Sequence, residues 1–272
     1  MPSKSFGDSR VDHSGFVRKE YLVDNTLTVV YIAGEGPDLV YLHGGGTWHG
    51  LNFARQWTDR YRVIIPYHPG FGQSDDNSDI TCVQDYLLHY RELFDIMELK
   101  RFNLVGFSFG GRLAAEYAIH FTDQIEKLVL VAPAGLDVKE HPQPDFTVIP
   151  PEEIPSYLVH DIQVLIPFMP AGPDEEFAKM RMREGSTVGK MMRNDSMVNP
   201  KLTNWLHRLT MPTRLIWGEN DRIVPPGQGP IWQHLIPQSD LKVFENAGHL
   251  VLDESVDACK SISSFLARPD IA

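Results

Sequence analysis

The stretch that decides the fold is Leu104-Val105-Gly106-Phe107-Ser108-Phe109-Gly110-Gly111, an apolar run that ends in a serine held between glycines. The residues on either side predict a short buried strand over 101–105 and a helix with one apolar face over 111–121. A serine on a tight turn between a strand and a helix projects its hydroxyl above the edge of the sheet, and backbone crowding there requires small neighbours. Gly106 and Gly110 have the spacing that this turn needs, so the stretch indicates a nucleophile elbow.

A second glycine-rich turn, His43-Gly44-Gly45-Gly46, directly follows a short apolar strand predicted over 38–42. Successive glycines let the backbone approach a ligand closely and turn amide N–H groups toward an oxygen atom. On its own the run would fit a flexible surface turn equally well. Together with the elbow it favours an oxyanion hole.

Size and charge limit the classes of partner. The chain has 272 residues and a mass of 30.8 kDa, which suits one large α/β domain or two small ones. Its 25 basic and 36 acidic residues give a net charge of −11, which argues against nucleic acid and anionic lipid and favours a small neutral or apolar ligand.

Neither the start of the chain nor its apolar runs suggest a membrane or a secretory route. Residues 1–20 contain no apolar core of the signal-peptide kind, and no run approaches the roughly 18 apolar residues of a membrane span. A soluble cytoplasmic protein is therefore expected. Cys82 and Cys259 lie in predicted helices and are expected to be small buried apolar residues, with a disulfide left open.

Apolar strands alternate with amphipathic helices along most of the chain. Two runs at 16–23 and 27–33, separated by Asp24-Asn25, predict an antiparallel hairpin. Continuous apolar strands are predicted at 38–42, 61–65, 101–105, 127–131, 213–217 and 241–244, and helices at 48–59, 80–99, 111–121 and 228–236, with a closing helix after His249 that ends at residue 265. This alternation indicates a parallel sheet covered by helices on both faces.

Residues 136–208 break this alternation. Nine prolines punctuate short helical patterns at 157–168, 174–184 and 201–208, which predicts an inserted helical cap. Six of the nine methionines fall in this segment, and their flexible thioethers suit an adaptable apolar pocket. The chain is thus expected to comprise a loose arm at 1–15, a core at 16–135 and 209–272, and a cap at 136–208.

Four stretches occur in a characteristic order: the glycine run, the elbow, Gly218-Glu219-Asn220-Asp221 and Gly248-His249. The last two each follow a short apolar strand. In this order and context the chain resembles the α/β-hydrolase fold from about residue 16 to its end. The resemblance implies a mostly parallel eight-stranded sheet with helices on both faces and an inserted helical cap.

The resemblance also implies roles for three side chains. Ser108 would be the nucleophile and His249 the base that removes its proton, because a serine hydroxyl is a poor nucleophile without such a base. Asp221 would orient the imidazole and stabilise its protonated form. Asp137, which follows the preceding core strand, is the alternative acid.

The backbone amides of Gly45 and Phe109 would complete the machinery as the oxyanion hole. A metal site built from His43, His49 and His68 is conceivable, but no tight ligand spacing supports it. No cofactor is implied, because the glycine run lacks the spacing of a dinucleotide fingerprint and no phosphate-binding loop occurs.

The sequence predicts the type of reaction less directly than it predicts the fold. A serine at the elbow argues against haloalkane dehalogenases and epoxide hydrolases, which resemble this fold but use an aspartate there. Hydrolysis of a small or medium carboxylic ester through an acyl-enzyme is the leading hypothesis, since a capped, methionine-rich pocket suits a small or medium apolar group rather than a polymer.

Carbon-carbon bond hydrolysis of the meta-cleavage-product type is the alternative. Thr47 and Leu250 stand where those enzymes typically have proline and tryptophan, but Arg181, Arg183 or Arg193 could bind a substrate carboxylate from the cap. Lactone and thioester hydrolysis and a noncatalytic small-molecule receptor stay open as well. The sequence does not predict the oligomeric state.

Overall fold

An eight-stranded sheet forms the centre of the protein, as seen in a computed structural model that describes residues 11–145, 148–150 and 152–269. The order of its strands is β1-β2-β4-β3-β5-β6-β7-β8. Their bounds are β1 (Val17–Val23), β2 (Thr26–Ala33), β3 (Asp38–Leu42), β4 (Arg62–Pro66), β5 (Phe102–Phe107), β6 (Ile125–Val131), β7 (Thr213–Gly218) and β8 (Ser239–Phe244).

The sheet is mostly parallel, as the sequence predicts. Strands β3 to β8 run parallel to one another, while β2 is antiparallel to both β1 and β4. β1 and β2 form the predicted hairpin. Asp24 and Asn25 connect them with φ values of 42° and 60°, the left-handed conformation that a two-residue hairpin turn needs.

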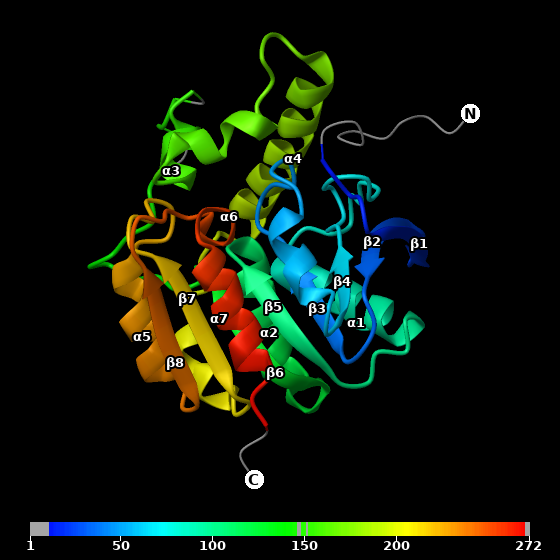
Figure 1. Ribbon diagram of the computed structural model, residues 1–272, viewed down its shortest axis with the longest axis vertical. Helices are drawn as coiled ribbons and strands as arrows, with labels where there is room; N and C mark the ends of the chain where they lie inside the picture. The colour runs from blue at the N-terminus through cyan, green and yellow to red at the C-terminus, as the bar shows by residue number, and fades with distance from the viewer. Residues whose placement is uncertain (1–10, 146–147, 151, 270–272) are drawn as a thin grey trace.

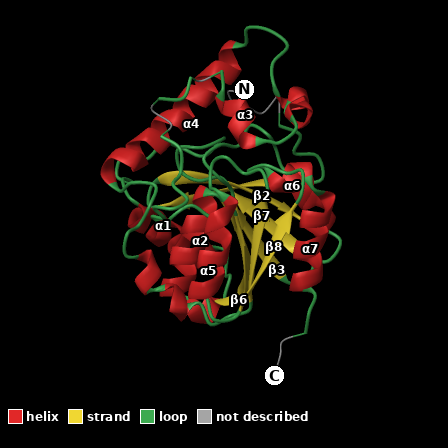
Figure 2. Ribbon diagram, turned by 90° about the vertical axis from the view of Figure 1, so that its left-hand side faces the viewer, coloured by secondary structure: helices red, strands yellow, loops and turns green. Residues whose placement is uncertain are grey.

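Helices cover both faces of the sheet, which explains why its central strands are continuously apolar. Helices α1, α2 and α5 lie on one face and α7 lies on the other (Figure 2). Their bounds are α1 (Val83–Ile96), α2 (Phe109–His120), α5 (Gly229–Leu235) and α7 (Val256–Leu266), with the short α6 (Val251–Glu254) before α7. The helix predicted over 48–59 is wrong in type and extent, because Gly50 has a φ of +83° and only a 3₁₀ helix at Asn52–Trp57 follows it.

Between β6 and β7 the described chain forms no strand, and its two α-helices lie above the sheet (Figure 1), whereas its 3₁₀ turn at Leu206–Arg208 contacts α2 and α5. This segment holds α3 (Ile154–Leu158) and α4 (Glu175–Asn194). Its predicted helix boundaries are wrong. The 157–168 and 201–208 helices are each replaced by two 3₁₀ turns, and α4 continues ten residues past its expected end at residue 184.

The start of the described chain packs against the core, so the expectation of a loose arm is wrong for residues 11–15; residues 1–10 lie outside the described residues. Val11 is buried, and the ring of His13 stacks on Tyr31 with 4.0 Å between centroids. Both cysteines are free, Cys82 half-buried before α1 and Cys259 buried in α7. No helix within the described ranges is both long and apolar enough to cross a membrane.

Candidate active site

The predicted elbow has an unusual backbone conformation at its serine. Ser108 has φ 54° and ψ −116° and joins β5 directly to α2, so both elements extend closer to the serine than the sequence predicts. A Cβ atom on Gly106 would lie 2.3 Å from the carbonyl oxygen of Gly110, and one on Gly110 would lie 2.2 Å from that of Leu42. Glycine is therefore required at both positions, because strand and helix approach each other too closely for any side chain.

Ser108, His249 and Asp221 form a continuous chain of polar contacts. Oγ of Ser108 lies 2.8 Å from Nε2 of His249, and Nδ1 of His249 lies 2.8 Å from Oδ2 of Asp221. All three residues are buried. A carboxylate can only accept, so Nδ1 carries the imidazole proton and Nε2 is left to accept a hydrogen bond from the serine hydroxyl. This is the arrangement that activates a serine for nucleophilic attack.

Backbone amides fix the carboxylate of Asp221, which lies at the end of this series of contacts. Oδ1 of Asp221 accepts hydrogen bonds from the amides of Ile223 and Val224, at 2.8 and 2.9 Å, which leaves Oδ2 to face His249. Asp137, the alternative acid, has an exposed side chain. The structure thus places Asp221 in contact with the imidazole.

The glycine run lies beside Ser108 and is held by a neutral histidine. His43 donates from Nδ1 to the carbonyl oxygen of Gly44 at 2.7 Å and accepts at Nε2 from the amide of His68 at 3.0 Å. Burial lowers the pKa of His43 well below its usual value, in keeping with an imidazole that accepts at one nitrogen. A Cβ atom on Gly44 would lie 3.2 Å from Cβ of Ser108, so the loop passes close to the serine.

The bond from His43 also sets the direction of the next amide. In a trans peptide the carbonyl and the N–H point to opposite sides, so turning the Gly44 carbonyl toward His43 turns the Gly45 amide away from it. No backbone carbonyl of the described residues accepts a hydrogen bond from the amide of Gly45 or Phe109. Two donors without backbone partners are thus available near Ser108.

His43, His49 and His68 do not come together as metal ligands. His68 contacts the carbonyl oxygen of His43 and the hydroxyl of Tyr90, while Nδ1 of His49 lies 3.2 Å from a carboxylate oxygen of Asp253. Within the described part of the chain, no cluster of three or more histidine, cysteine, aspartate or glutamate side chains is placed to hold a metal ion.

A cavity of about 390 Å³ opens over Ser108. Its walls come from both sides of the site and are mostly apolar. The core contributes Gly45, Gly46, Trp48, His49, Phe107, Phe109, Ile223, His249 and Leu250, and the segment above the sheet contributes Ile154, Leu158, Arg181, Gly185, Val188, Gly189, Met192 and Met197. Two of the six methionines in the predicted cap, Met192 and Met197, line it. Met180 and Met191 are packed in the interior, and Met169 and Met182 are exposed.

Of the three arginines considered for a substrate carboxylate, Arg181 faces this cavity. Its guanidinium lies 5.2 Å from the ring centre of Trp48, and it forms no ion pair with any described residue. Burial lowers the pKa of Arg181, and the carboxylate of Glu184 partly offsets that effect. Arg183 instead pairs with Asp76 at 2.9 Å, and Arg193 is exposed.

Glu184 is a site residue that sequence reasoning missed. Its side chain is 1% exposed and accepts hydrogen bonds from Thr47 and Gly72. A glutamate in a helical pattern carries no signal for this role, because its partner Thr47 is 137 residues away in the sequence.

Comparison with known proteins identifies the family. A family model described as the alpha/beta hydrolase family matches residues 39–260. The chain belongs to the alpha/beta hydrolase family. It is therefore an enzyme of the hydrolase class, as the resemblance in the sequence predicts.

Relatives of this hydrolase include enzymes named for dienoate substrates. It is 31% identical over 252 residues to a 2-hydroxy-6-oxo-6-phenylhexa-2,4-dienoate hydrolase of Comamonas testosteroni, covering 83% of this chain and 85% of that protein. It is 26% identical over 268 residues to a 2-hydroxy-6-oxo-2,4-heptadienoate hydrolase of Pseudomonas putida, covering 89% of this chain and 94% of that one.

Solved structures share the fold of this hydrolase at low sequence identity. A membrane phospholipase A superposes with a TM-score of 0.80 at 22% identity, over 95% of this chain and 88% of that one. A naproxen esterase of Bacillus subtilis gives 0.73 at 18% identity, over 92% of this chain and 91% of that one. These likenesses concern the fold alone.

Proposed function

We propose that this hydrolase cleaves small or medium carboxylic esters, with Ser108 as nucleophile, His249 as base and Asp221 as the acid that orients the imidazole. The observation that carries the proposal is the unbroken chain of 2.8 Å contacts from Asp221 through His249 to Ser108, at a mostly apolar cavity of about 390 Å³. A cavity of this size and character suits a small apolar acyl or alcohol group.

The reaction would proceed in two halves. Nε2 of His249 takes the serine proton as Oγ attacks the ester carbonyl, and the amides of Gly45 and Phe109 donate to the oxyanion that forms. Nε2 then gives the proton to the leaving alcohol, which leaves an acyl group on Ser108. Water attacks that acyl group with the same imidazole as base, and the carboxylic acid departs.

The test is hydrolysis of p-nitrophenyl esters of increasing acyl chain length by the wild type and Ser108→Ala at matched folded concentrations. Turnover by the wild type alone, together with labelling of Ser108 by a fluorophosphonate seen by mass spectrometry, would support the proposal. Lactones and thioesters present the same reactive carbonyl and belong in the same panel. Binding of esters without turnover would instead favour a receptor.

Carbon-carbon bond hydrolysis is the second candidate, and Arg181 favours it. A guanidinium in a mostly apolar cavity, without an ion-pair partner among the described residues, suits a substrate that carries a carboxylate. The two relatives from Comamonas testosteroni and Pseudomonas putida are named for 2-hydroxy-6-oxo dienoates, which carry such a group. In this reaction Ser108 would act at the 6-oxo carbonyl while Arg181 holds the carboxylate.

The two candidates are separated by their substrates. A 2-hydroxy-6-oxo-dienoate absorbs visible light and loses its absorbance when the carbon-carbon bond is cleaved, so its decay can be followed directly. A value of kcat/KM for the dienoate far above that for every ester would favour the second candidate. The reverse ranking would favour ester hydrolysis.

A further inference from the structure

Glu184 joins helix α4 to the two loops beneath it. Oε1 accepts from the hydroxyl of Thr47 at 2.6 Å and from the amide of Gly72 at 3.1 Å, and Oε2 accepts from the amide of Thr47 at 3.2 Å. A buried carboxylate is stable only when its lone pairs have such partners. The amides of Thr47 and Gly72 can only donate, so each carboxylate oxygen faces a donor that an amide nitrogen in its place could not satisfy.

Thr47 directly follows the glycine run, so Glu184 holds that run at one end while His43 holds it at the other. His43 binds the carbonyl oxygen of Gly44, and Glu184 binds both the amide and the hydroxyl of Thr47. Only Gly45 and Gly46 lie between these two attachments. The amide of Gly45, one of the two proposed oxyanion donors, is therefore restrained from both sides.

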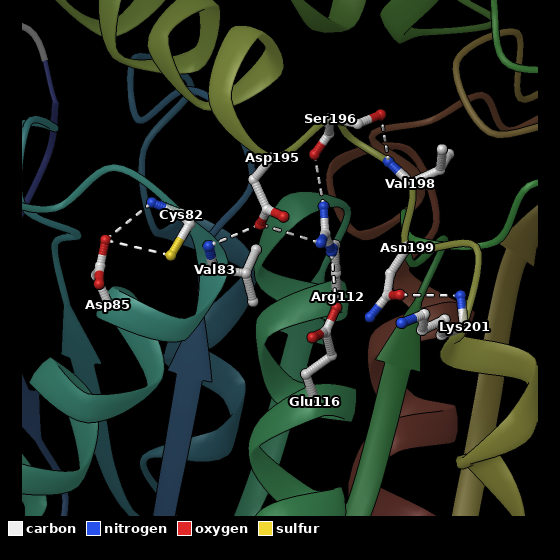
Figure 3. A network of polar contacts seen from close by, with 10 residues as sticks. All are labelled: Cys82, Val83, Asp85, Arg112, Glu116, Asp195, Ser196, Val198, Asn199 and Lys201. Carbon is white, nitrogen blue, oxygen red and sulfur yellow. Dashed lines mark hydrogen bonds and ion pairs between the residues drawn. The ribbon is translucent and has the colours of Figure 1, made fainter.

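Helix α4 is a firm support for this contact, because it is attached to the core at further points. Arg183 donates to the carbonyl oxygen of Gly72 at 2.7 Å. At the carboxyl end of α4, Oδ2 of Asp195 accepts from the amide of Val83 at 2.8 Å and from Nη2 of Arg112 at 3.2 Å. Figure 3 shows Asp195 between the start of α1 and Arg112, which extends from α2, the helix that follows Ser108.

We propose that Glu184 is a positioning residue for the oxyanion hole. From α4 it holds Thr47, and through Thr47 it keeps the Gly45 amide directed at the oxygen that becomes negatively charged in the transition state. This inference rests on the proposed function, since it takes Gly45 as an oxyanion donor. Glu184 should therefore affect binding of the transition state more than binding of the substrate.

The experiment compares Glu184→Gln, Thr47→Val and Thr47→Ser with the wild type on the best ester found. Losing an oxyanion donor altogether costs about 100- to 1000-fold in kcat, so displacing one should cost about tenfold or more. We expect that loss for Glu184→Gln, whose amide nitrogen would face a donor, and for Thr47→Val, which lacks the hydroxyl. KM should change little, and Thr47→Ser should restore most of kcat because it keeps the hydroxyl.

Inhibitor binding supplies a readout that a purely structural role would not change. An alkyl boronic acid forms a tetrahedral adduct with the serine and places an oxygen in the oxyanion hole, whereas the neutral alcohol product makes only ground-state contacts. In Glu184→Gln and Thr47→Val, the affinity for the boronic acid should fall in parallel with kcat/KM. The affinity for the neutral alcohol product should stay within about twofold of the wild type, because its ground-state contacts are unchanged.

Two further variants serve as controls. Asp195→Asn weakens the attachment of α4 at its carboxyl end without touching Thr47, and Glu176→Gln alters an exposed residue in the first turn of the same helix. We expect Asp195→Asn to lower the melting temperature without the selective loss of boronic acid affinity. Glu176→Gln should behave as the wild type.

Unchanged kcat in folded Glu184→Gln would overturn the inference, as would the same selective loss in Asp195→Asn, which would indicate general loosening of α4. Should Glu184→Gln fail to fold, equal activity of Thr47→Val and Thr47→Ser would overturn it instead. A wild type that hydrolyses no substrate of the panel would contradict the proposed function and the inference with it. A wild type whose activity requires Ser108 but not Glu184 would contradict the inference alone.

Discussion

Nε2 of His249 lies 2.8 Å from Oγ of Ser108, although 141 positions separate the two residues in the sequence. The imidazole can take the serine proton only in the tautomer that Asp221 selects at Nδ1. We expect Asp221→Asn to lower kcat by about a thousandfold or more while the protein stays folded, because an amide can hold the other tautomer in place.

The measurement is the single-turnover acylation rate of Asp221→Asn, with folding checked by circular dichroism. Asp137→Asn is the matched control, since that side chain is exposed and lies outside the contact chain. A larger loss in Asp137→Asn than in Asp221→Asn would transfer the role of the acid to Asp137.

Arg181 should discriminate between charged and neutral substrates. A charged hydrogen bond contributes roughly 1.5–3 kcal/mol, so Arg181→Met should lower kcat/KM about 10- to 100-fold for substrates with a carboxylate distant from the cleaved bond. Neutral esters of the same length should be affected far less. Arg193→Met, at the exposed end of the same helix, is the control, and an equal loss on both substrate classes would argue against an anion-binding role.

Replacing glycine by alanine should have opposite effects on the free energy of unfolding at the elbow and in α4. Gly110→Ala would place a methyl group 2.2 Å from the carbonyl oxygen of Leu42, so it should destabilise the fold by several kcal/mol or prevent folding. Gly185→Ala in α4 meets no atom within 4 Å and should raise the free energy of unfolding by about 0.5–1 kcal/mol. Urea unfolding of both variants checks the prediction, and equal stabilities would contradict it.

Three buried histidines should make stability depend on pH between about 5 and 7, and one of them is His43, whose pKa burial holds well below its usual value. Burial lowers the pKa of His68 to about 3 and that of His89 to about 4, from 6.5 in the unfolded chain. Below pH 6.5 the unfolded chain therefore binds more protons than the folded one, so the free energy of unfolding falls as pH falls. Above that value their full contribution is present.

The expected slope is roughly 1.4 kcal/mol per pH unit for each buried histidine below about pH 6. Urea unfolding at pH 7, 6 and 5 measures it in a range where most carboxylates are ionised in both states. His89→Gln, which keeps a polar partner for Thr28, should reduce the slope by the share of one histidine. A slope that His89→Gln leaves unchanged would show that the pKa of His89 is the same in the folded and unfolded chains.

The parts of the fold that the sequence predicts are those whose signals are local. The strand, serine and helix of the elbow are contiguous in the sequence, and Gly106 must be glycine because of the carbonyl oxygen of Gly110 in the same turn. The buried strands can also be predicted from the sequence, because strands covered on both faces are apolar throughout. The hairpin at Asp24-Asn25 depends on two adjacent residues with positive φ.

The parts that the sequence does not predict depend on distant contacts. Glu184 and Thr47 are in contact although 137 positions separate them in the sequence, and no pattern near either residue predicts the contact. The sequence also does not predict the full length of α4, because two glycines interrupt its helical pattern. Gly185 and Gly189 resemble a helix end, since glycine weakens a helix, yet both lie inside α4 where it lines the cavity.

Those two glycines set stability and substrate range against each other. Replacing either by alanine strengthens α4 but takes space from the cavity, so a lineage selected for heat resistance would tend to fill these positions and lose its bulkier substrates. A lineage that must cleave a larger substrate gains by keeping both glycines. The breadth of substrates can therefore evolve at two positions that lie outside the proposed catalytic chemistry.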